Sequence, residues 1–384
     1  MDYKLLATGL VVGLIVGVVI GYFGRGAPAP AVVTTTSTSA VSTSASPPPP
    51  AAPAPFAIGA AGTLKFAYGD LLKIYKVLYP SITTAPPLFK GSGAVAQSEV
   101  ITKQFSLVAA ADTTTIPSVL FANNLTDYEI AFGLTQMVVI VNLNTTAGRT
   151  VYDLWRQAAQ YQPLSAQWNA TWREIFSIIA LNSSTTVGVS DPFTDPSGYQ
   201  AMCMLKLAGL TFFGNSSYLL NAVYGNPSKY VMRETETDLL PIMASGQIQF
   251  ILSAYESNAV AQTKEYRGTA YITLPDLVNL GSLGYAAYYH KVDVVWTEAG
   301  TTKKFSCNPV IYTLTIPKTA PDPQAALYFA LLLFSPAGQR ILSENGIRPI
   351  IPGIVYGNYS SVPLPLRPFV VPLSQVPQYA AAFP

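Results

Sequence analysis

Short apolar runs alternate along this chain with amphipathic stretches that open at Gly, Ser, Thr or Asp, the pattern of strands followed by helices. The apolar runs predict strands at 64–68, 106–110, 137–141, 187–189, 248–253 and 310–316. The amphipathic stretches predict helices at 71–78, from 91 onward, and at 113–121, 172–179, 196–210, 237–243, 323–334 and 337–344. Strands that alternate with helices indicate an α/β fold, in which ligands bind at the carboxyl ends of the strands.

The N-terminal part departs from this pattern. Residues 5–23 are an uninterrupted apolar run, long enough to cross a bilayer, and we expect a transmembrane anchor there with residues 1–4 in the cytoplasm. A cleaved signal peptide is the alternative. Residues 24–61 are expected to be a disordered stalk rich in Pro, Ser and Thr, because such a composition cannot form a core. Glycines at every fourth position would allow a homodimer in the membrane: Gly9, Gly13, Gly17 and Gly21.

Composition narrows the class of protein. Charged residues make up 11% of the chain and the net charge is +2, which argues against nucleic acid as a partner. Six glycosylation sequons favour an exported glycoprotein: Asn124, Asn144, Asn169, Asn182, Asn215 and Asn358. Cys203 and Cys307 are the two cysteines, and the sequence leaves open whether they pair. One histidine, His290, and no Cys-x-x-Cys argue against a zinc site.

The segment 190–199 carries the most specific chemistry. Asp195 followed by Pro196 predicts a helix start with Asp195 as its N-cap. Backbone N–H groups and the helix dipole at such a start suit an oxyanion, but an acid there would repel an ordinary anion. An anion whose centre is a hard metal resolves this conflict, because the metal can accept a carboxylate oxygen as a ligand.

Three other turns bring Gly, Ser or Asp to an expected helix start. They are Gly69-Asp70, Gly91-Ser92 and Ala111-Asp112. Each alone is an ordinary helix cap. Together with Asp195 they predict a cleft lined by helix N-termini, which holds an oxyanion without countercharges.

These segments resemble the archaeal-type tungstate/molybdate-binding proteins of ATP-driven (ABC) importers. The resemblance runs in order from about 64 to 355. The motifs that carry it are Phe66 to Leu71, Gly91-Ser92, Ala110-Ala111-Asp112-Thr113-Thr114-Thr115-Ile116, Asp195-Pro196-Ser197-Gly198-Tyr199, Leu274-Pro275-Asp276, Tyr285-Ala286-Ala287-Tyr288-Tyr289-His290-Lys291-Val292, Pro309-Val310-Ile311-Tyr312, Ile316-Pro317-Lys318, Glu344-Asn345-Gly346 and Pro349-Ile350-Ile351-Pro352.

The resemblance implies a two-lobed, hinged periplasmic-binding-protein-like fold of type II. We expect the oxyanion-binding domain to occupy 62–384. Its lobe 1 is placed at about 62–145 and 305–355, its lobe 2 at about 146–304, and a Pro-rich tail at 356–384.

The resemblance also implies the ligand residues. In that family two acids bond the metal of the oxyanion, and here they fall on Asp195 and Glu236; a shift of register would select Glu234 or Asp238 instead. The implied neutral donors are Ser92, Ala111 with Asp112, Gly69, and Tyr255 if one residue is inserted. Tungstate or molybdate would be the ligand, and no resident cofactor is implied.

Asp70 departs from the family, which has Ser at that turn. A third acid could weaken the site, could point outward while its backbone N–H still binds, or could be protonated in acid.

The expected function is a membrane-anchored extracellular receptor that is no enzyme and delivers its oxyanion to an ABC permease. Alternatives are a structural or adhesive surface glycoprotein that has lost the ligand, a hydrolase that uses Asp195 and Glu236 as paired carboxylates, and a receptor for another oxyanion. The sequence does not choose between tungstate and molybdate.

Overall fold

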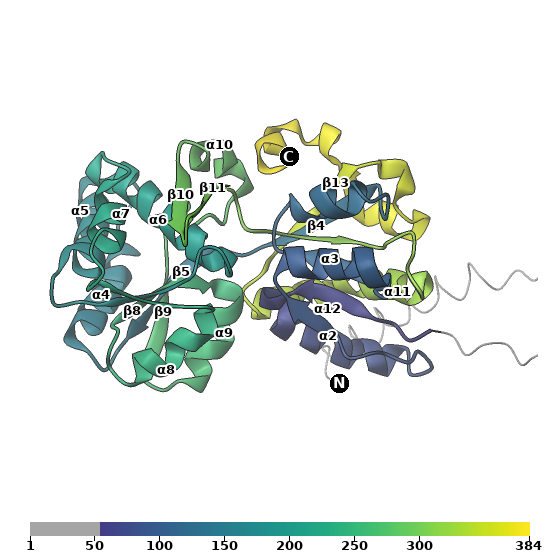
Figure 1. The fold of residues 1–384 in the computed structure, drawn as a ribbon, viewed down its shortest axis with the longest axis horizontal. Coiled ribbons are helices and arrows are strands. Elements are labelled where there is room, and N and C mark those ends of the chain that lie inside the picture. The colour runs from purple at the N-terminus through teal and green to yellow at the C-terminus, as the bar shows by residue number, and fades with distance from the viewer. Residues whose placement is uncertain (1–53) are drawn as a thin grey trace, which may run out of the picture. The chain divides into compact units, whose positions relative to one another are not determined.

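The computed structural model describes residues 54–384, which form one compact unit with two main β-sheets (Figure 1). The expected anchor at 5–23, its four glycines and the stalk up to residue 53 lie outside the described residues. Within residues 54–384, no single helix is both long and apolar enough to cross a bilayer, whereas the bent pair Pro323–Phe334 and Pro336–Glu344 reaches that length and composition jointly.

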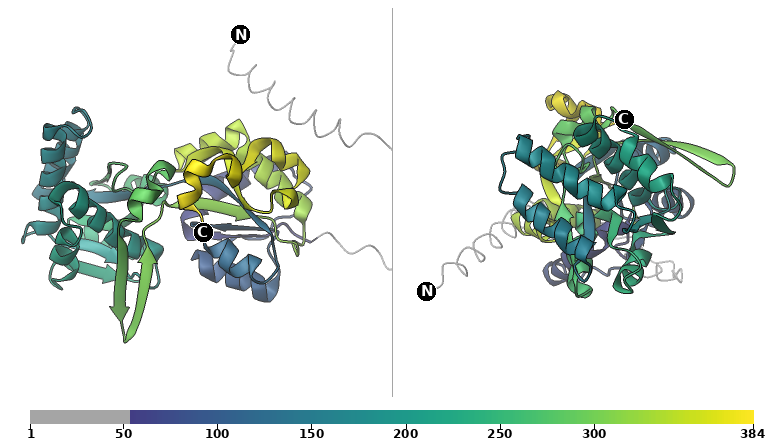
Figure 2. Two further views of the ribbon diagram at one scale, coloured as in Figure 1. Left: turned by 90° about the horizontal axis from the view of Figure 1, so that it is seen from above. Right: turned by 90° about the vertical axis from the view of Figure 1, so that its left-hand side faces the viewer.

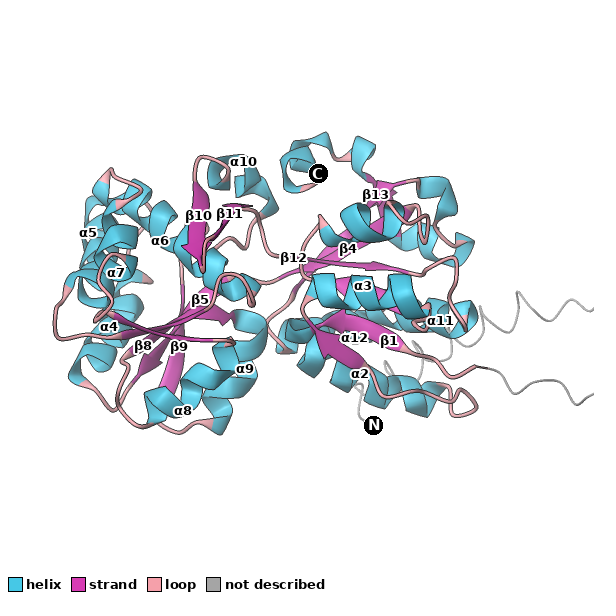
Figure 3. Ribbon diagram, in the orientation of Figure 1, coloured by secondary structure: helices cyan, strands magenta, loops and turns pink. Residues whose placement is uncertain are grey.

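The larger sheet and its helices form the part here called lobe 1. Its seven strands lie in the order β14-β13-β4-β12-β3-β1-β2. They are β1 (Ile58–Ala61), β2 (Leu88–Lys90), β3 (Leu107–Ala110), β4 (Tyr128–Leu134), β12 (Ile311–Thr315), β13 (Arg348–Gly357) and β14 (Val370–Pro372), with helices α2 (Lys65–Leu78), α3 (Ser92–Thr102), α11 (Pro323–Phe334) and α12 (Pro336–Glu344). Every residue of the central strands β1, β3 and β12 is buried, because helices cover the sheet on both faces (Figure 3).

The second sheet and its helices form lobe 2. Its five strands lie in the order β7-β6-β8-β5-β9. They are β5 (Met137–Asn142), β6 (Val187–Ser190), β7 (Tyr230–Arg233), β8 (Phe250–Tyr255) and β9 (Thr269–Thr273), with helices α4 (Thr146–Ala158), α5 (Ala166–Phe176), α6 (Pro196–Phe213), α7 (Tyr218–Tyr224), α8 (Leu239–Ala244) and α9 (Glu256–Glu265). The predicted α/β class is therefore confirmed for both sheets.

The chain passes between the two sheets at two places. The first lies between β4 and β5, at Thr135 and Gln136, so the expected boundary near 145 was placed too late. Both flanking strands are apolar and no Gly or Pro turn separates them, so the pattern gives no sign that the second run joins another sheet. The second passage follows β11 and leads into β12, close to the expected position near 305.

Between β9 and β12 the chain forms α10 (Ala286–Tyr289) and a hairpin of β10 (Asp293–Glu298) and β11 (Thr301–Ser306). The hairpin projects away from the body of lobe 2 (Figure 2). Ala299 and Gly300 at its tip have φ values of 48° and 79°. Two positive φ values in a two-residue loop are typical of the turn that matches strand twist in hairpins.

The beginning of the domain differs from the prediction. The first strand is β1, at 58–61, and the predicted strand at 64–68 lies largely in α2. Phe56 is 1% exposed and its backbone N–H donates to the Thr83 carbonyl, so the folded part begins before residue 62. In the sequence Ile-Gly-Ala-Ala of β1, Ile58 is the one residue of high β-propensity, and Gly and Ala are depleted in strands, so the strand signal is weak and the composition resembles that of the preceding stalk.

The C-terminal residues belong to lobe 1. β14 pairs in parallel with β13, and Ala382 and Phe383 are buried against the sheet. The segment expected to be a Pro-rich tail therefore completes the lobe.

Candidate functional site

Asp195 joins two segments of lobe 2. As predicted, it is the N-cap of α6: its Oδ1 accepts a hydrogen bond of 2.9 Å from the backbone N–H of Ser197, and Pro196 occupies the first helical position. Its Oδ2 accepts a second bond of 2.9 Å from the backbone N–H of Glu236. One carboxylate thus fixes the start of α6 against the turn that precedes α8.

The close fit of this turn requires a glycine. A Cβ atom added at Gly198 would lie 2.5 Å from the carbonyl oxygen of Ser190, at the end of β6. The Ser190 hydroxyl in turn lies 2.9 Å from the hydroxyl of Ser197. The first turn of α6 is therefore packed directly onto the strand end, which places the Asp195 cap at the carboxyl edge of the sheet.

Glu236 is the buried acid of its segment. Its side chain is 7% exposed, Oε1 accepts a hydrogen bond from Asn258 Nδ2, and Oε2 is buried without a partner. Glu234 is exposed, and Asp238 forms a capping box with Thr235. The geometry therefore favours Glu236 over the two alternatives that the sequence left open.

The two acids stand close together without a cation. Burial raises the pKa of the Glu236 carboxyl to about 8, and the negative charge of Asp195 adds to the rise. Burial also raises the pKa of Asp195, although backbone N–H groups of Ser197 and Glu236 favour its carboxylate. In the described part of the chain neither acid forms an ion pair. The pair therefore favours a proton or another positive centre between them.

Tyrosine hydroxyls surround these acids from both lobes. Tyr255, the last residue of β8, is 1% exposed and its hydroxyl is buried without a partner. Burial raises the pKa of Tyr255, and the nearby Tyr199, Asp195, Glu236 and Tyr312 raise it further. Tyr312 lies on β12 of lobe 1, and its hydroxyl is 2.9 Å from the hydroxyl of Ser257 on α9 of lobe 2. The site therefore lies where the two lobes meet.

Four buried polar atoms at this place have no hydrogen-bond partner among residues 54–384. They are Glu236 Oε2, Tyr255 OH, Asn258 Oδ1 and Thr63 Oγ1. Burial raises the pKa of Tyr312, and the nearby hydroxyls of Ser257 and Thr63 oppose part of that rise. A buried polar group without a hydrogen bond costs about 1–3 kcal/mol, so such a cluster is typical of a site whose partners come from a ligand.

Ser92, Ala111 and Asp112 come together in lobe 1, as predicted. Ser92 is the first residue of α3, is 7% exposed, and its hydroxyl accepts a hydrogen bond of 3.0 Å from the backbone N–H of Ala111. The Asp112 carboxylate accepts from the backbone N–H groups of Thr114 and Thr115, at 2.8 and 2.6 Å. Asp112 thus caps the following turn. Burial raises the pKa of Tyr199 on lobe 2, and the negative charge of Asp112 adds to that rise.

The prediction that Gly69 and Asp70 form the first helix start was wrong. Both lie inside α2, where backbone N–H groups already bond to the preceding turn. Asp70 pairs with Lys73 at 2.8 Å and accepts from Asn345 at 3.2 Å, and these contacts lower its pKa. The turn after β1 is instead Gly62–Leu64, which contains Thr63. The sequence signal for this turn is the run of small residues that ends in Gly62-Thr63.

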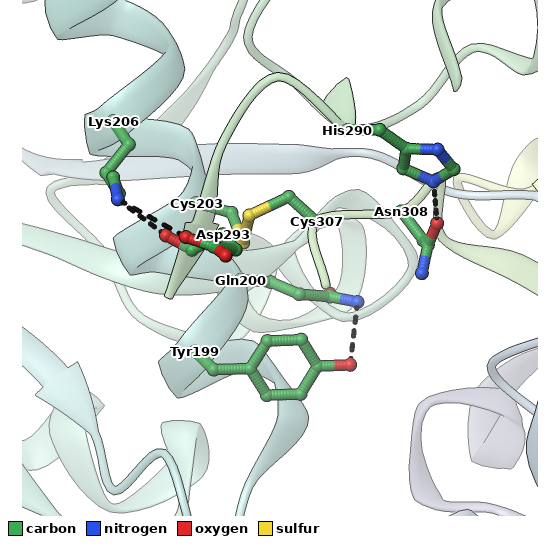
Figure 4. Close-up of a disulfide and its surroundings, with 8 residues drawn as sticks. All are labelled: Tyr199, Gln200, Cys203, Lys206, His290, Asp293, Cys307 and Asn308. Carbon is green, nitrogen blue, oxygen red and sulfur yellow. Dashed lines mark hydrogen bonds and ion pairs between the residues drawn. A yellow bond between two sulfur atoms is a disulfide. The ribbon is translucent and has the colours of Figure 1, made fainter. Parts of the chain in front are cut away.

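Cys203 and Cys307 form a disulfide, which answers the question that the sequence left open (Figure 4). Cys203 lies on α6, and Cys307 directly follows β11. A pocket of about 390 Å³ opens beside Cys307 and is also lined by His290, whose Nε2 hydrogen-bonds to Asn308 Oδ1. Neither Asp195 nor Glu236 lines this pocket, so the acids are at a separate place.

Residues 54–384 contain no group of three or more His, Cys, Asp or Glu side chains that could hold a metal ion. A metal at Asp195 and Glu236 would therefore need ligands of its own, as the metal of an oxyanion has.

Comparison with known proteins identifies a family and several relatives of the whole domain. Residues 56–348 match the family described as bacterial extracellular solute-binding protein. A molybdate/tungstate-binding protein, WtpA, of Pyrococcus abyssi is 28% identical over 70% of this chain and 76% of its own length. The protein of the same name from Thermococcus kodakarensis is 27% identical over 70% and 74%. The solved sulfate-binding protein SubI of Mycobacterium tuberculosis has a TM-score of 0.53 at 11% identity, covering 85% of this chain and 96% of its own, and is similar in fold.

Proposed function

The chain belongs to the bacterial extracellular solute-binding protein family, and we propose that its interlobe site captures tungstate or molybdate. Proteins of this family bind solutes and are no enzymes, and the chain has the mixed α/β fold of periplasmic binding proteins. The observation that carries the proposal is the pair of acids, the half-buried Asp195 and the buried Glu236, among hydroxyl groups that lack partners within residues 54–384.

The acids argue for an anion with a metal at its centre. Sulfate and phosphate present only oxygens to Asp195 and Glu236, so the Asp195 carboxylate would repel them, as would Glu236 in its deprotonated form. Tungstate and molybdate have a hard, high-valent metal that can accept a carboxylate oxygen, which turns the repulsion into a bond. The site would then discriminate between anions because its carboxylates disfavour sulfate and phosphate. The names of the two archaeal relatives support this cargo.

The same groups argue for a site in use. A fold that had lost its ligand would gain stability by filling or pairing the buried atoms at Glu236, Tyr255 and Asn258, because each unpartnered atom is costly. Their persistence favours a receptor over the structural or adhesive alternative.

We further propose the setting of this receptor. Residues 5–23 would anchor the chain in the cell membrane, a stalk up to about residue 53 would hold the domain outside the cell, and an ABC permease would receive the anion. Pairing of anchors through Gly9, Gly13, Gly17 and Gly21 would make the receptor a dimer. The binding domain would run from about residue 54 to 384. The chain would pass from lobe 1 to lobe 2 at 135–136 and return to lobe 1 just before β12.

Calorimetric titration of the full-length protein, stripped of bound anion, tests the cargo. Tungstate and molybdate should bind tightly, and sulfate and phosphate should not. The variants Asp195→Asn and Glu236→Gln should each weaken binding strongly. Asn keeps the cap bond to the Ser197 N–H but cannot also accept from the Glu236 N–H, so Asp195→Asn tests the carboxylate together with that second bond. Glu234→Gln, an exposed acid of the same segment, is the matched control and should bind like the wild type. Equal affinity in all four proteins would refute the assignment of the acids.

A further inference from the structure

One face of α6 connects the candidate acid to the hairpin. Asp195, Tyr199 and Cys203 are spaced by four residues and therefore lie on one side of the helix. The same side meets the end of β11, where Phe305 packs on Tyr199 and Cys307 is bonded to Cys203. The disulfide joins the helix that carries the acid to the end of the hairpin (Figure 4), and the Tyr199–Phe305 stack adds a contact one turn earlier on the helix.

The contacts along this face hold the Tyr199 ring in one position. Its ring lies 4.5 Å from the ring of Phe305, with an angle of 8° between the planes. Phe305 is itself held edge-on by Phe193, from the turn before Asp195. About two turns further along α6, Lys206 donates a hydrogen bond of 2.6 Å to the Asp293 carbonyl at the start of β10. Both strands of the hairpin are therefore fastened to the helix.

The Tyr199 hydroxyl is left with a free proton. Its hydrogen bond is a long one of 3.5 Å, in which it accepts from Gln200 Nε2. Asp195 caps α6 one turn before Tyr199, on the same side of the helix. Burial raises the pKa of Tyr199, and the charges of Asp112 of lobe 1 and Asp195 raise it further. Within residues 54–384, the hydroxyl has no hydrogen bond in which it donates its proton.

We propose that the Tyr199 hydroxyl is a further ligand of the bound oxyanion, donating to one of its oxygens, and that Phe305 positions it. This inference rests on the proposed function. Phe305 acts only through the tyrosine, and the disulfide fixes the strand end that carries Phe305. A neutral donor adds affinity without the positive charge that would also attract sulfate.

The test is a double-mutant cycle measured by tungstate titration of the full-length protein. Tyr199→Phe keeps the stacked ring and removes the hydroxyl, and it should weaken binding about ten- to a hundredfold, as for a hydrogen bond to a charged group. Phe305→Leu should weaken binding in the wild type but cause no further loss when Tyr199 is already Phe. A structural role of Phe305 alone would produce the same loss in both backgrounds.

Tyr224→Phe is the control. The Tyr224 hydroxyl is also buried without a partner, but its ring packs against Tyr230 and Trp296, and its loss should leave the affinity unchanged. Wild-type affinity in Tyr199→Phe, with the melting temperature of the anion-free protein unchanged, would overturn this inference and leave the proposed function intact. Failure of the wild type to bind either tungstate or molybdate would overturn both.

Discussion

Glu236 should make the anion-free protein less stable as the pH rises. Burial raises its pKa from the ordinary 4.5 to about 8, so the folded protein holds this proton more tightly than the unfolded chain does. The stability that the protonated Glu236 contributes is fully present below pH 4.5 and is lost as the pH rises towards 8. The loss amounts to about 1.4 kcal/mol per pH unit, or roughly 5 kcal/mol over the whole window.

The replacement Glu236→Gln isolates this effect, because Gln resembles the protonated acid and does not titrate. The free energy of unfolding, measured by urea denaturation of anion-free protein at several pH values, should be similar in variant and wild type near pH 4. The variant should become the more stable protein above pH 5, and the difference should grow up to about pH 8. Groups common to both proteins cancel in this difference.

Glu174→Gln provides the control, since this glutamate is exposed on α5 of the same lobe and its charge is screened by water. A difference between wild type and Glu236→Gln that does not change with pH would refute the reasoning. It would mean that Glu236 is solvated or paired in the folded protein and is not the buried, proton-binding acid described above.

Three further predictions concern other parts of the domain. Thr63→Val should weaken tungstate binding about tenfold and Asp70→Asn should leave it unchanged, because the hydroxyl at the first turn belongs to Thr63. Titration of both variants checks this; a loss of affinity in Asp70→Asn but not in Thr63→Val would contradict the placement of α2. Replacing Cys203 and Cys307 together by Ser should lower the free energy of unfolding by up to about 5 kcal/mol, because the disulfide spans 104 residues; urea denaturation measures it, and an unchanged midpoint would count against the bond. Glu129→Gln should raise the melting temperature at pH 8 more than at pH 4.5, because burial raises the pKa of Glu129 well above its ordinary value and neither carboxyl oxygen has a partner; equal shifts at the two pH values would argue against a buried, protonated acid.

Helix starts could be predicted from the sequence, because the capping residue and the N–H group it binds lie within one turn of the chain. The pair Asp195-Pro196 predicted the start of α6, and Asp322 with Pro323 and Ser335 with Pro336 mark the two later helices in the same way. In each case the cap bonds to a backbone N–H two or three residues further on, so the evidence lies within one turn of chain.

Long-range contacts account for what the sequence did not reveal. β1 has a weak strand signal, and it is a central strand only because β2 and β3 pair with it on both sides. Because β1 was missed, the prediction placed the first turn at Asp70 when it lies at Thr63. The predicted site therefore contained a third acid that the structure places elsewhere, inside α2. Asn258 and Tyr312 were also missed, because their contacts with Glu236 and Ser257 join segments far apart in the chain.

The arrangement of the two acids explains how one site can be both stable and selective. Both oxygens of Asp195 are held by backbone N–H groups, and one of these donors belongs to Glu236, so the fold itself brings the second acid beside the first. This bond is made to the backbone and leaves the Glu236 side chain free, with one oxygen bonded to Asn258 and the other without a partner. The two carboxyl groups are therefore fixed close together before any ligand arrives, and they repel each other once Glu236 has lost its proton. An anion that offers only oxygens adds further negative charge, whereas a metal centre can bond to both carboxylates and relieve that repulsion. Selectivity would then arise from the repulsion between Asp195 and Glu236. The neutral hydroxyl groups would add affinity by donating hydrogen bonds to the oxygens of the bound anion.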